Sequence, residues 1–305
     1  MSEAKEGYRK MNEFSKYHPI VNFAYFLAIL GFSMVFMHPI TLAISLMVGF
    51  SYSLMLNGKT SLKFNLVYML PLVFVTALIN PAFNHEGMTI IAYLPSDNPL
   101  TLESIIYGIA AAVMLWSVIC HFSCFNKIMT SDKFVYLFGK LVPSLSLILS
   151  MVLRFVPKFK AQIKVVSTAQ SYIGKDVSQG SILDRAKNGI KILSIMITRS
   201  LENAIDTSDS MKSRGYGLPK RTAYSNYKLQ KRDIMVLIYI TLLSAYIIVG
   251  SIFKTLYFSY LPVIKGTDIT PYTISVFIAY LLLFICPIII ELWEDVKWKK
   301  LKSKI

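Results

Sequence analysis

Residues 181–217 read SILDRAKNGIKILSIMITRSLENAIDTSDSMKSRGYG, a stretch in which apolar and charged side chains follow a helical period. Ser181 is the predicted N-cap, and Asp184 stands where a capping box places an acid. Gly215 is predicted to end the helix in a left-handed turn, which leaves Arg214 in the last turn. The small and apolar residues recur at steps of three or four and so share one face: Ala186, Ile190, Leu193, Ile197, Leu201, Ala204, Ser208 and Met211.

The opposite face of this helix is charged. It carries Asp184, Arg185, Lys187, Lys191, Arg199, Glu202, Asp206, Asp209 and Lys212. A charge at the centre of a bilayer costs about 2.5–3.5 kcal/mol on insertion scales. The helix is therefore predicted to lie in water, along a membrane surface or against another protein, and not to span a membrane.

The rest of the chain is more apolar. Hydrophobic residues make up 54% of the 305 residues and charged residues only 16%, against roughly a quarter charged in soluble domains. Runs long enough to cross a bilayer occupy six ranges: 20–36, 39–56, 64–80, 102–122, 234–253 and 273–292. The predicted fold class is an all-α integral membrane protein with about six transmembrane helices and long cytoplasmic amphipathic helices.

Loop charges predict the orientation of these helices. Lys and Arg precede the first run and stand between the second and third, and five Lys follow the last, whereas residues 81–101 contain no Lys or Arg. Positively charged loops stay in the cytoplasm. We therefore expect a multi-pass protein of the bacterial plasma membrane with both termini cytoplasmic.

Most of the net charge of +15 lies in one region. Residues 127–232 hold 19 Lys or Arg against six Asp or Glu, a surplus of 13. Three domains are predicted: 1–126 with membrane helices one to four, 127–232 as a cytoplasmic helical region, and 233–305 with membrane helices five and six and a basic tail. Within the middle region we expect helices at about 131–138, 143–173 and 182–214.

The helix expected at 143–173 changes character along its length. Pro143 begins it, and Arg154 and Pro157 mark where a membrane-dipping half gives way to an amphipathic half. A charge in an apolar run suggests a functional role, but the interpretation we prefer is structural, with Arg154 reaching the lipid headgroups. Gly174 is predicted to end the helix. Its apolar stripe is Phe159, Ile163, Val166, Ala169 and Ile173.

Few residues suggest that the chain itself binds a nucleotide or a metal or catalyses a reaction. Neither GxxxxGK[ST] nor GxGxxG occurs, so a partner would have to supply any ATP site. Cys120 and Cys124 are four apart on a helix beside His121, a spacing that could hold a metal, but small buried side chains at a helix end are the favoured interpretation. No metal, cofactor or enzymatic activity is predicted.

The charged helix surfaces fit partners better than catalysis. Glu291, Glu294 and Asp295 share a helix face beside Trp293 and are interpreted as a solvated helix end. The basic amphipathic helices are predicted to contact the lipid bilayer with their inner faces and proteins with their far ends. Nucleic acid is a poor fit because acids interrupt the basic runs.

Four stretches carry a resemblance to a known family. They are YHP at 17–19, LVP at 141–143 with SMVLRFVP at 150–157, AQSYIG at 169–174 and SMKSRGY at 210–216. Together they resemble the transmembrane T component (EcfT) of energy-coupling factor (ECF) transporters, a family that includes the membrane subunit associated with cobalt uptake. The similarity extends over about residues 17–233.

The resemblance implies a non-catalytic coupling subunit. In that family, two Ala-Arg-Gly signatures end coupling helices that dock into two ABC-type ATPase subunits, and a separate S component, a substrate-binding membrane protein, captures a vitamin or metal ion. The signatures correspond here to Tyr172, Ile173 and Gly174, and to Ser213, Arg214, Gly215 and the following Tyr216.

The first signature departs from the family pattern because Ile173 replaces its arginine. Loss of one member of a buried interfacial charge pair costs about 2–5 kcal/mol. The resemblance therefore implies that the ATPase facing Ile173 is altered too, or that Ile173 packs into an apolar groove.

Two other functions were weighed. A permease of an ordinary ABC importer would need a polar pathway through the membrane, and the apolar runs offer little beyond Asn22, Asn65, Asn80 and some Ser and Thr. A membrane-embedded lipid-modifying enzyme would need acids or histidines within the membrane. The coupling subunit is the preferred prediction.

Overall fold

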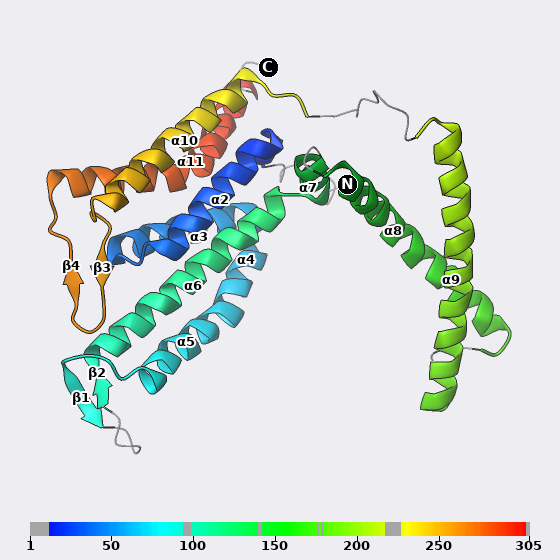
Figure 1. The fold of residues 1–305 in the computed structure, drawn as a ribbon, viewed down its shortest axis with the longest axis horizontal. Coiled ribbons are helices and arrows are strands. Elements are labelled where there is room, and N and C mark those ends of the chain that lie inside the picture. The colour runs from blue at the N-terminus through cyan, green and yellow to red at the C-terminus, as the bar shows by residue number, and fades with distance from the viewer. Residues whose placement is uncertain are drawn as a thin grey trace. The chain divides into compact units, whose positions relative to one another are not determined.

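The computed structural model describes residues 12–93, 99–139, 142–175, 177, 180–216 and 227–302. The chain divides into two compact units (Figure 1). The membrane unit joins Met1–Thr130 to Tyr227–Ile305, and the α7–α9 unit is Ser131–Asn226. Each unit is described in turn.

Six apolar helices build the membrane unit. Five segments are long and apolar enough to cross a membrane, and α2, with 17 residues, is a shorter apolar helix. At 1.5 Å per residue α2 spans about 26 Å, near the lower limit for crossing a bilayer. An all-α membrane protein is confirmed, with helices at the six predicted ranges: α2 Pro19–Val35, α3 Pro39–Asn57, α4 Lys59–Phe64 continuing into α5 Leu70–Phe83, α6 Leu102–Ile128, α10 Lys231–Ile252 and α11 Pro271–Lys302.

The first two helices start with the same device. His18 and His38 are their N-caps, and each Nδ1 accepts a hydrogen bond from the backbone N–H two residues later, at 3.3 Å and 3.2 Å. A proline follows each histidine at the first helical position, where its missing N–H removes no helical bond. The short connection between the two helices is thus followed by the same His-Pro start that begins the first of them.

The third apolar segment contains a wide turn. A π-helical turn, η3 (Asn65–Met69), separates α4 from α5, and the Leu70 N–H bonds to the Asn65 carbonyl. Pro71, at the start of α5, has no N–H to give to the preceding turn. The irregularity lies in that preceding turn, where the Asn65 side chain accepts a hydrogen bond from Trp116 Nε1 at 2.9 Å.

The core of the membrane unit forms around α11. In the most apolar stretch of α11, 56% of the residues are buried inside the unit. In the corresponding stretch of the segment that contains α5, only 11% are buried. Tyr280, Leu283 and Phe284 are fully buried, and the Tyr25 hydroxyl donates to the Phe284 carbonyl at 2.8 Å. Helix α11 is therefore central, whereas α5 lies at the edge of the unit.

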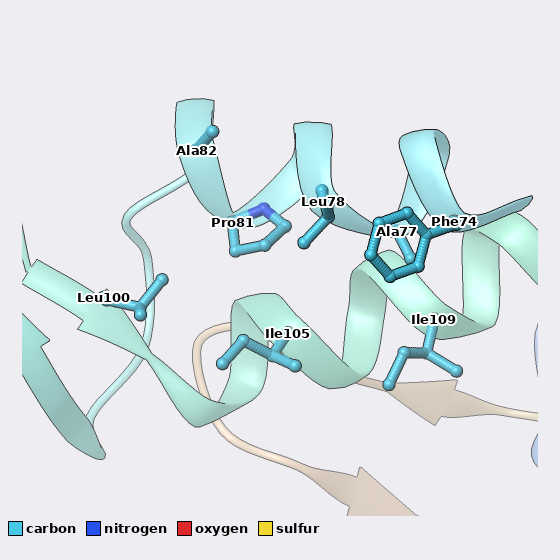
Figure 2. Close-up of a pocket in the computed structure, with 8 residues that line it drawn as sticks. All are labelled: Phe74, Ala77, Leu78, Pro81, Ala82, Leu100, Ile105 and Ile109. Carbon is cyan, nitrogen blue, oxygen red and sulfur yellow. The ribbon is translucent and has the colours of Figure 1, made fainter. Parts of the chain in front are cut away.

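Helix α5 packs against α6 through a backbone contact. Pro81 has no N–H to bond to the Ala77 carbonyl, and a Cβ built on Gly108 would lie only 2.6 Å from that oxygen. Position 108 therefore requires glycine for α5 and α6 to pack this closely. Beside it lies an apolar groove of about 490 Å³, shown in Figure 2, lined by Phe74, Ala77, Leu78, Pro81, Ala82, Leu100, Ile105 and Ile109.

Two short hairpins connect membrane helices. In the α5–α6 connection, β1 (Ile90–Tyr93) pairs antiparallel with β2 (Pro99–Thr101). In the α10–α11 connection, β3 (Phe258–Ser259) pairs antiparallel with β4 (Lys265–Gly266). Both hairpins lie in segments that the loop charges predict to be external.

The described residues of the α7–α9 unit form three helices. They are α7 Ser131–Gly139, α8 Pro143–Tyr172 and α9 Ile182–Ser213, each within one residue of its predicted range. The Ser181 hydroxyl accepts from the Leu183 N–H at 3.2 Å, as expected of the N-cap of α9.

Helices α8 and α9 contact each other through a small cluster. Val166, Ile192 and Met196 are its buried members. Val166 belongs to the stripe predicted on α8, but Ile192 and Met196 lie beside the stripe predicted on α9. That stripe is exposed, with Leu193 at 58% and Leu201 at 62%. Two adjacent rows of α9 are apolar, and α8 covers the row that carries Ile192 and Met196.

Candidate functional site

The second signature forms the C-terminal end of α9. The Tyr216 N–H bonds to the Met211 carbonyl and the Gly215 N–H to the Lys212 carbonyl, both at 2.9 Å. Gly215 has a φ of +75°. This pair of bonds closing on a left-handed glycine is a Schellman motif. The predicted glycine turn is present, and Arg214 is the C-cap residue that immediately follows the last helical position.

The first signature ends α8 with the same geometry. The Lys175 N–H bonds to the Gln170 carbonyl and the Gly174 N–H to the Ser171 carbonyl, both at 3.0 Å. Gly174 has a φ of +72° and Ile173 is the C-cap residue. Ile173 therefore takes the place in α8 that Arg214 takes in α9, and Lys175 takes the place of Tyr216.

The two ends present different side chains on one backbone shape. Arg214 is exposed at the end of α9, where the negative pole of the helix dipole favours a cation. Its guanidinium has the donor fork that suits a carboxylate. Ile173 is 60% exposed and Tyr172 85% exposed, so the end of α8 presents apolar surface. Ser213 is bound locally, its hydroxyl donating to the Ser210 carbonyl at 2.9 Å.

The fold keeps the two ends apart. Val166, near the end of α8, packs against Ile192 and Met196 of α9. From Ile192 to Arg214 the helix rises by about 33 Å at 1.5 Å per residue. The two signatures therefore lie at separate places along α9.

The other predicted residues of α8 lie within one continuous helix. Pro143 is at its first turn, and Pro157 is in its interior without ending it. Arg154 is exposed, with its Cζ 5.4 Å from the centre of the Phe155 ring. This is cation–π stacking on a neighbouring side chain; contact with lipid headgroups remains a prediction.

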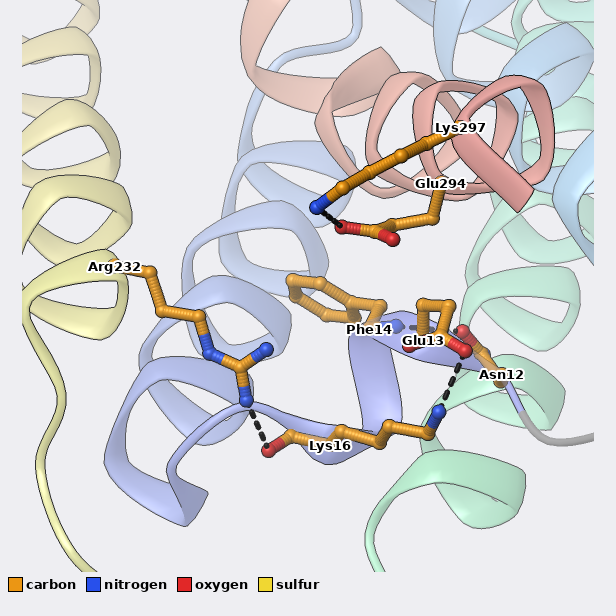
Figure 3. Close-up of polar contacts among 7 residues, drawn as sticks. All are labelled: Asn12, Glu13, Phe14, Lys16, Arg232, Glu294 and Lys297. Atoms are coloured by element: carbon orange, nitrogen blue, oxygen red, sulfur yellow. Dashed lines mark hydrogen bonds and ion pairs between the residues drawn. The ribbon is translucent and has the colours of Figure 1, made fainter. Parts of the chain in front are cut away.

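The Tyr17-His18-Pro19 stretch attaches the N-terminal segment to the start of α10. The Arg232 guanidinium lies 4.9 Å from the centre of the Tyr17 ring, and its Nη2 donates to the Lys16 carbonyl at 3.4 Å (Figure 3). The His18 N–H donates to the buried Asp233 carboxylate at 3.4 Å. Burial raises the pKa of Tyr17, and the charge of Arg232 opposes that shift. These contacts hold the start of α10 against the N-terminal segment.

Sequence reasoning missed this attachment. Gln230 and Asp233 form a capping box at the start of α10, in which the Gln230 N–H donates to Asp233 at 2.9 Å. The spacing of a polar N-cap and an acid three residues later was the available signal. The contact with Tyr17 and His18 joins residues more than 200 positions apart, which no local pattern indicates.

The acids near the end of α11 belong to a polar helix end. Glu294 pairs with Lys297 at 3.8 Å, as Figure 3 shows. The Tyr52 hydroxyl donates to Glu291 at 3.5 Å and accepts from Asn12 at 3.0 Å. These contacts tie α11 to α3 and to the short helix η2 (Glu13–Lys16) that follows Asn12.

The Cys120, His121 and Cys124 side chains pack α6 against its neighbours. Cys120 Sγ lies 3.3 Å from Asn65 Oδ1, and His121 Nε2 lies 3.1 Å from the Ser45 carbonyl. All three side chains are buried. Within the described ranges, no three His, Cys, Asp or Glu side chains gather as a metal site would require.

Comparison with known proteins gives a consistent result. The chain is 39% identical over 103 residues to the energy-coupling factor transporter transmembrane protein EcfT of Lactobacillus helveticus, a match covering 33% of this chain and 37% of that protein. The Lactococcus lactis protein of the same name is 34% identical over 111 residues, 36% of this chain and 42% of the relative. The Staphylococcus aureus protein is 34% identical over 97 residues, 32% and 36%.

The match thus spans about two fifths of the length of each of these relatives. Their names and the apolar helices indicate a multi-pass protein of the bacterial membrane. The family model described as cobalt transport protein, CbiQ, matches residues 15–224, more than half of the chain. The chain therefore belongs to the CbiQ family of cobalt transport proteins.

Proposed function

We propose that this chain is the non-catalytic membrane-coupling subunit, or T component, of an ECF importer. Two ABC-type ATPases dock on the ends of α8 and α9, and a separate S component binds the substrate, a vitamin or a metal ion. Motion driven by ATP hydrolysis passes through α8 and α9 to that protein. Family membership and the names of the relatives support this proposal.

The observation that carries the proposal is the pair of matched helix ends. The same two hydrogen bonds and the same left-handed glycine end both α8 and α9. Ile192, where α8 packs against α9, lies about 33 Å before Arg214 along α9. A repeated, separated structure of this kind fits two copies of one type of partner, such as the two ATPases of an importer. Since the sequence has no common phosphate-binding motif, the ATP sites belong to those partners.

Arg214 is the main electrostatic anchor in this proposal. The helix dipole and its own fork of donors both favour a carboxylate of the ATPase at this point. Gly215 and Tyr216 set the direction in which the chain continues beyond the end of α9. At the other end, Ile173 makes an apolar contact beside Tyr172 and Gly174.

The exposed stripe of α9 provides the second kind of contact. Ile190, Leu193, Ile197 and Leu201 are between 58% and 67% exposed. Fully burying one such side chain contributes about 1.5–3 kcal/mol. In our proposal the S component and the lipid bilayer cover this stripe, and both chain termini are cytoplasmic.

An ordinary permease gains less support. Polar side chains inside the membrane unit bond to one another: Asn65 donates to the Ser61 carbonyl at 2.9 Å and accepts from Trp116 at 2.9 Å. Ser33 and Ser45 share a hydrogen bond at 2.8 Å. These contacts join α2 to α3 and η3 to α4 and α6, and they explain Asn65, Ser33 and Ser45 as helix-packing groups.

The test is affinity purification of the intact chain in mild detergent, with identification of the proteins retained. Two ABC-type ATPases and a small membrane protein are expected with the wild type. Arg214→Ala should lose one ATPase, while Lys212→Ala, an exposed cation in the preceding turn, should retain both. Recovery of ATPases without a small membrane protein would favour the permease, and recovery of no ATPase would contradict the proposal.

A further inference from the structure

Helix α8 differs from α9 in the balance of its charges. It contains no Asp or Glu, and its four cations are Arg154, Lys158, Lys160 and Lys164. Helix α9 is nearly balanced, with five Lys or Arg against four Asp or Glu. Clustered charges of one sign attract a partner of the opposite sign, whereas interspersed charges largely cancel. Of the two helices, α8 is therefore the one that favours an anionic partner.

Two of these cations gather at one aromatic ring. The Arg154 Cζ lies 5.4 Å, and the Lys158 Nζ 6.0 Å, from the centre of the Phe155 ring, distances at which a cation is attracted to a ring. Because Arg154 and Lys158 are four residues apart, they share one side of the helix. Both are exposed, and no carboxylate of the described residues forms an ion pair with either. The ring thus collects two like charges that no acid balances.

An exposed apolar row runs along the adjacent side of α8. Ile148, Val152 and Val156 recur every four residues and are 57%, 48% and 58% exposed. At about 100° of rotation per residue, Phe155 lies between this row and the two cations. The contact of α8 with α9 lies further along the helix, in the cluster that contains Val166. Around this half of α8, the surface therefore changes from cationic through aromatic to aliphatic.

The surface of a bilayer that contains acidic lipids has the same order of chemistry. Its phosphates match the two cations, and its acyl chains match the apolar row. A free anion such as inorganic phosphate would meet the cations but leave the row in water. In the sequence, only residues 129–142 separate α8 from α6, which is long enough to cross a membrane. The membrane surface is therefore within reach of α8.

We infer that Arg154, Lys158 and Phe155 form a binding site for the phosphate of an acidic phospholipid, whose acyl chains lie against the row of Ile148, Val152 and Val156. The guanidinium fork of Arg154 suits two phosphate oxygens, and Lys158 adds a point charge. The site distinguishes acidic lipids from phosphatidylcholine, in which the choline cation offsets the phosphate. It goes beyond contact of Arg154 alone with headgroups, and it does not depend on the binding of ATPases.

The experiment uses the intact chain in phosphatidylcholine nanodiscs that contain a small fraction of photoactivatable phosphatidylglycerol. Label should appear on residues 148–158, and unlabelled phosphatidylglycerol should compete for it. Arg154→Gln with Lys158→Gln should reduce this label at least about tenfold, since each cation near an anionic surface contributes about fivefold in affinity. Lys187→Gln with Lys212→Gln removes the same charge from exposed positions of α9 and should leave the label on α8 unchanged. Exchanging the two cations, Arg154→Lys with Lys158→Arg, should retain most of it.

Four results would overturn the inference. The first is a wild type without label on α8, and the second is equal label in the wild type and the Arg154 and Lys158 glutamine pair. An equal loss in the α9 pair would show attraction to total charge and not a site. Displacement by inorganic phosphate as effective as that by phosphatidylglycerol would assign the cations to free anions. Because the measurement requires no ATPase, the inference and the proposed function can fail independently.

Discussion

The membrane unit and the α7–α9 unit bury apolar side chains to very different extents. Within the described residues, the largest cluster of the membrane unit contains 21 buried hydrophobic residues, whereas the cluster joining α8 to α9 contains three. The membrane helices therefore fix one another, while α8 and α9 leave most of their apolar residues uncovered. The membrane unit is therefore a scaffold, and we propose that partners cover the apolar surface of the α7–α9 unit.

The largest effect is expected from Arg214→Ala, which removes the main proposed partner contact of the α7–α9 unit. Leaving the opposing carboxylate unpaired should cost about 2–5 kcal/mol of docking free energy. Transport by the reconstituted complex should fall at least tenfold, while the thermal unfolding of the isolated chain should not change. Lys212→Ala is the matched control and should transport normally. Normal transport by Arg214→Ala would remove this residue from the coupling site.

The next largest effect should come from Gly108→Leu, which disrupts helix packing in the membrane unit. The new side chain would meet the Ala77 carbonyl, which lies 2.6 Å from the position of its Cβ, and would force α5 away from α6. Overpacking of this kind costs about 1–3 kcal/mol, to be read from thermal unfolding in detergent. At Gly31 of α2 a Cβ would meet nothing within 4 Å, so Gly31→Leu should unfold like the wild type. Equal stability of the two variants would contradict the close α5–α6 packing.

A smaller effect should separate the glycines that end helices from one within a helix. Gly174→Ala and Gly215→Ala each place a Cβ on a left-handed backbone, at about 1–2 kcal/mol, and should weaken ATPase binding. Asn tolerates this conformation, so Gly215→Asn should retain more binding than Gly215→Ala. Gly189, inside α9 with open space around it, is the control, and Gly189→Ala should bind fully. Binding that is unaffected at Gly174 and Gly215 would show that the turns are not part of the interface.

The smallest effect concerns pH and the stability of α7. Burial lowers the pKa of Lys133 from 10.5 to about 8, so the folded unit binds its proton less tightly than the unfolded chain. Stability should therefore rise as pH increases from about 8 towards 10.5, where only the unfolded state keeps the proton. The protection factors of the α7 amides, corrected for the intrinsic exchange rate at each pH, should rise over this range in the wild type, and this rise should be absent in Lys133→Met. The same pH dependence in both proteins would assign it to other groups.

Local patterns predicted much of this molecule. Apolar run lengths placed the six apolar helices of the membrane unit, Gly174 was predicted to end α8, and Gly215 was predicted to end α9 in a left-handed turn. The row of α9 that meets α8 could not be predicted, because the rows containing Leu193 and Ile192 have the same period and tertiary packing decides between them.

Two further features depend on contacts that no window of sequence contains. Asp233 receives the His18 N–H from 215 positions away, and Ile192 and Met196 of α9 pack against Val166 of α8. In both cases the residue types were visible, but only the folded chain brings them together.

The central claim is that the ends of α8 and α9 each contact an ATPase. The most direct measurement is photocrosslinking in cells from benzoylphenylalanine placed at position 173 or 214, with position 83, where Phe83 is 82% exposed at the end of α5, as the control. The account predicts that positions 173 and 214 crosslink to ABC-type ATPase subunits and that position 83 does not. Crosslinks to no ATPase from both helix ends would contradict it.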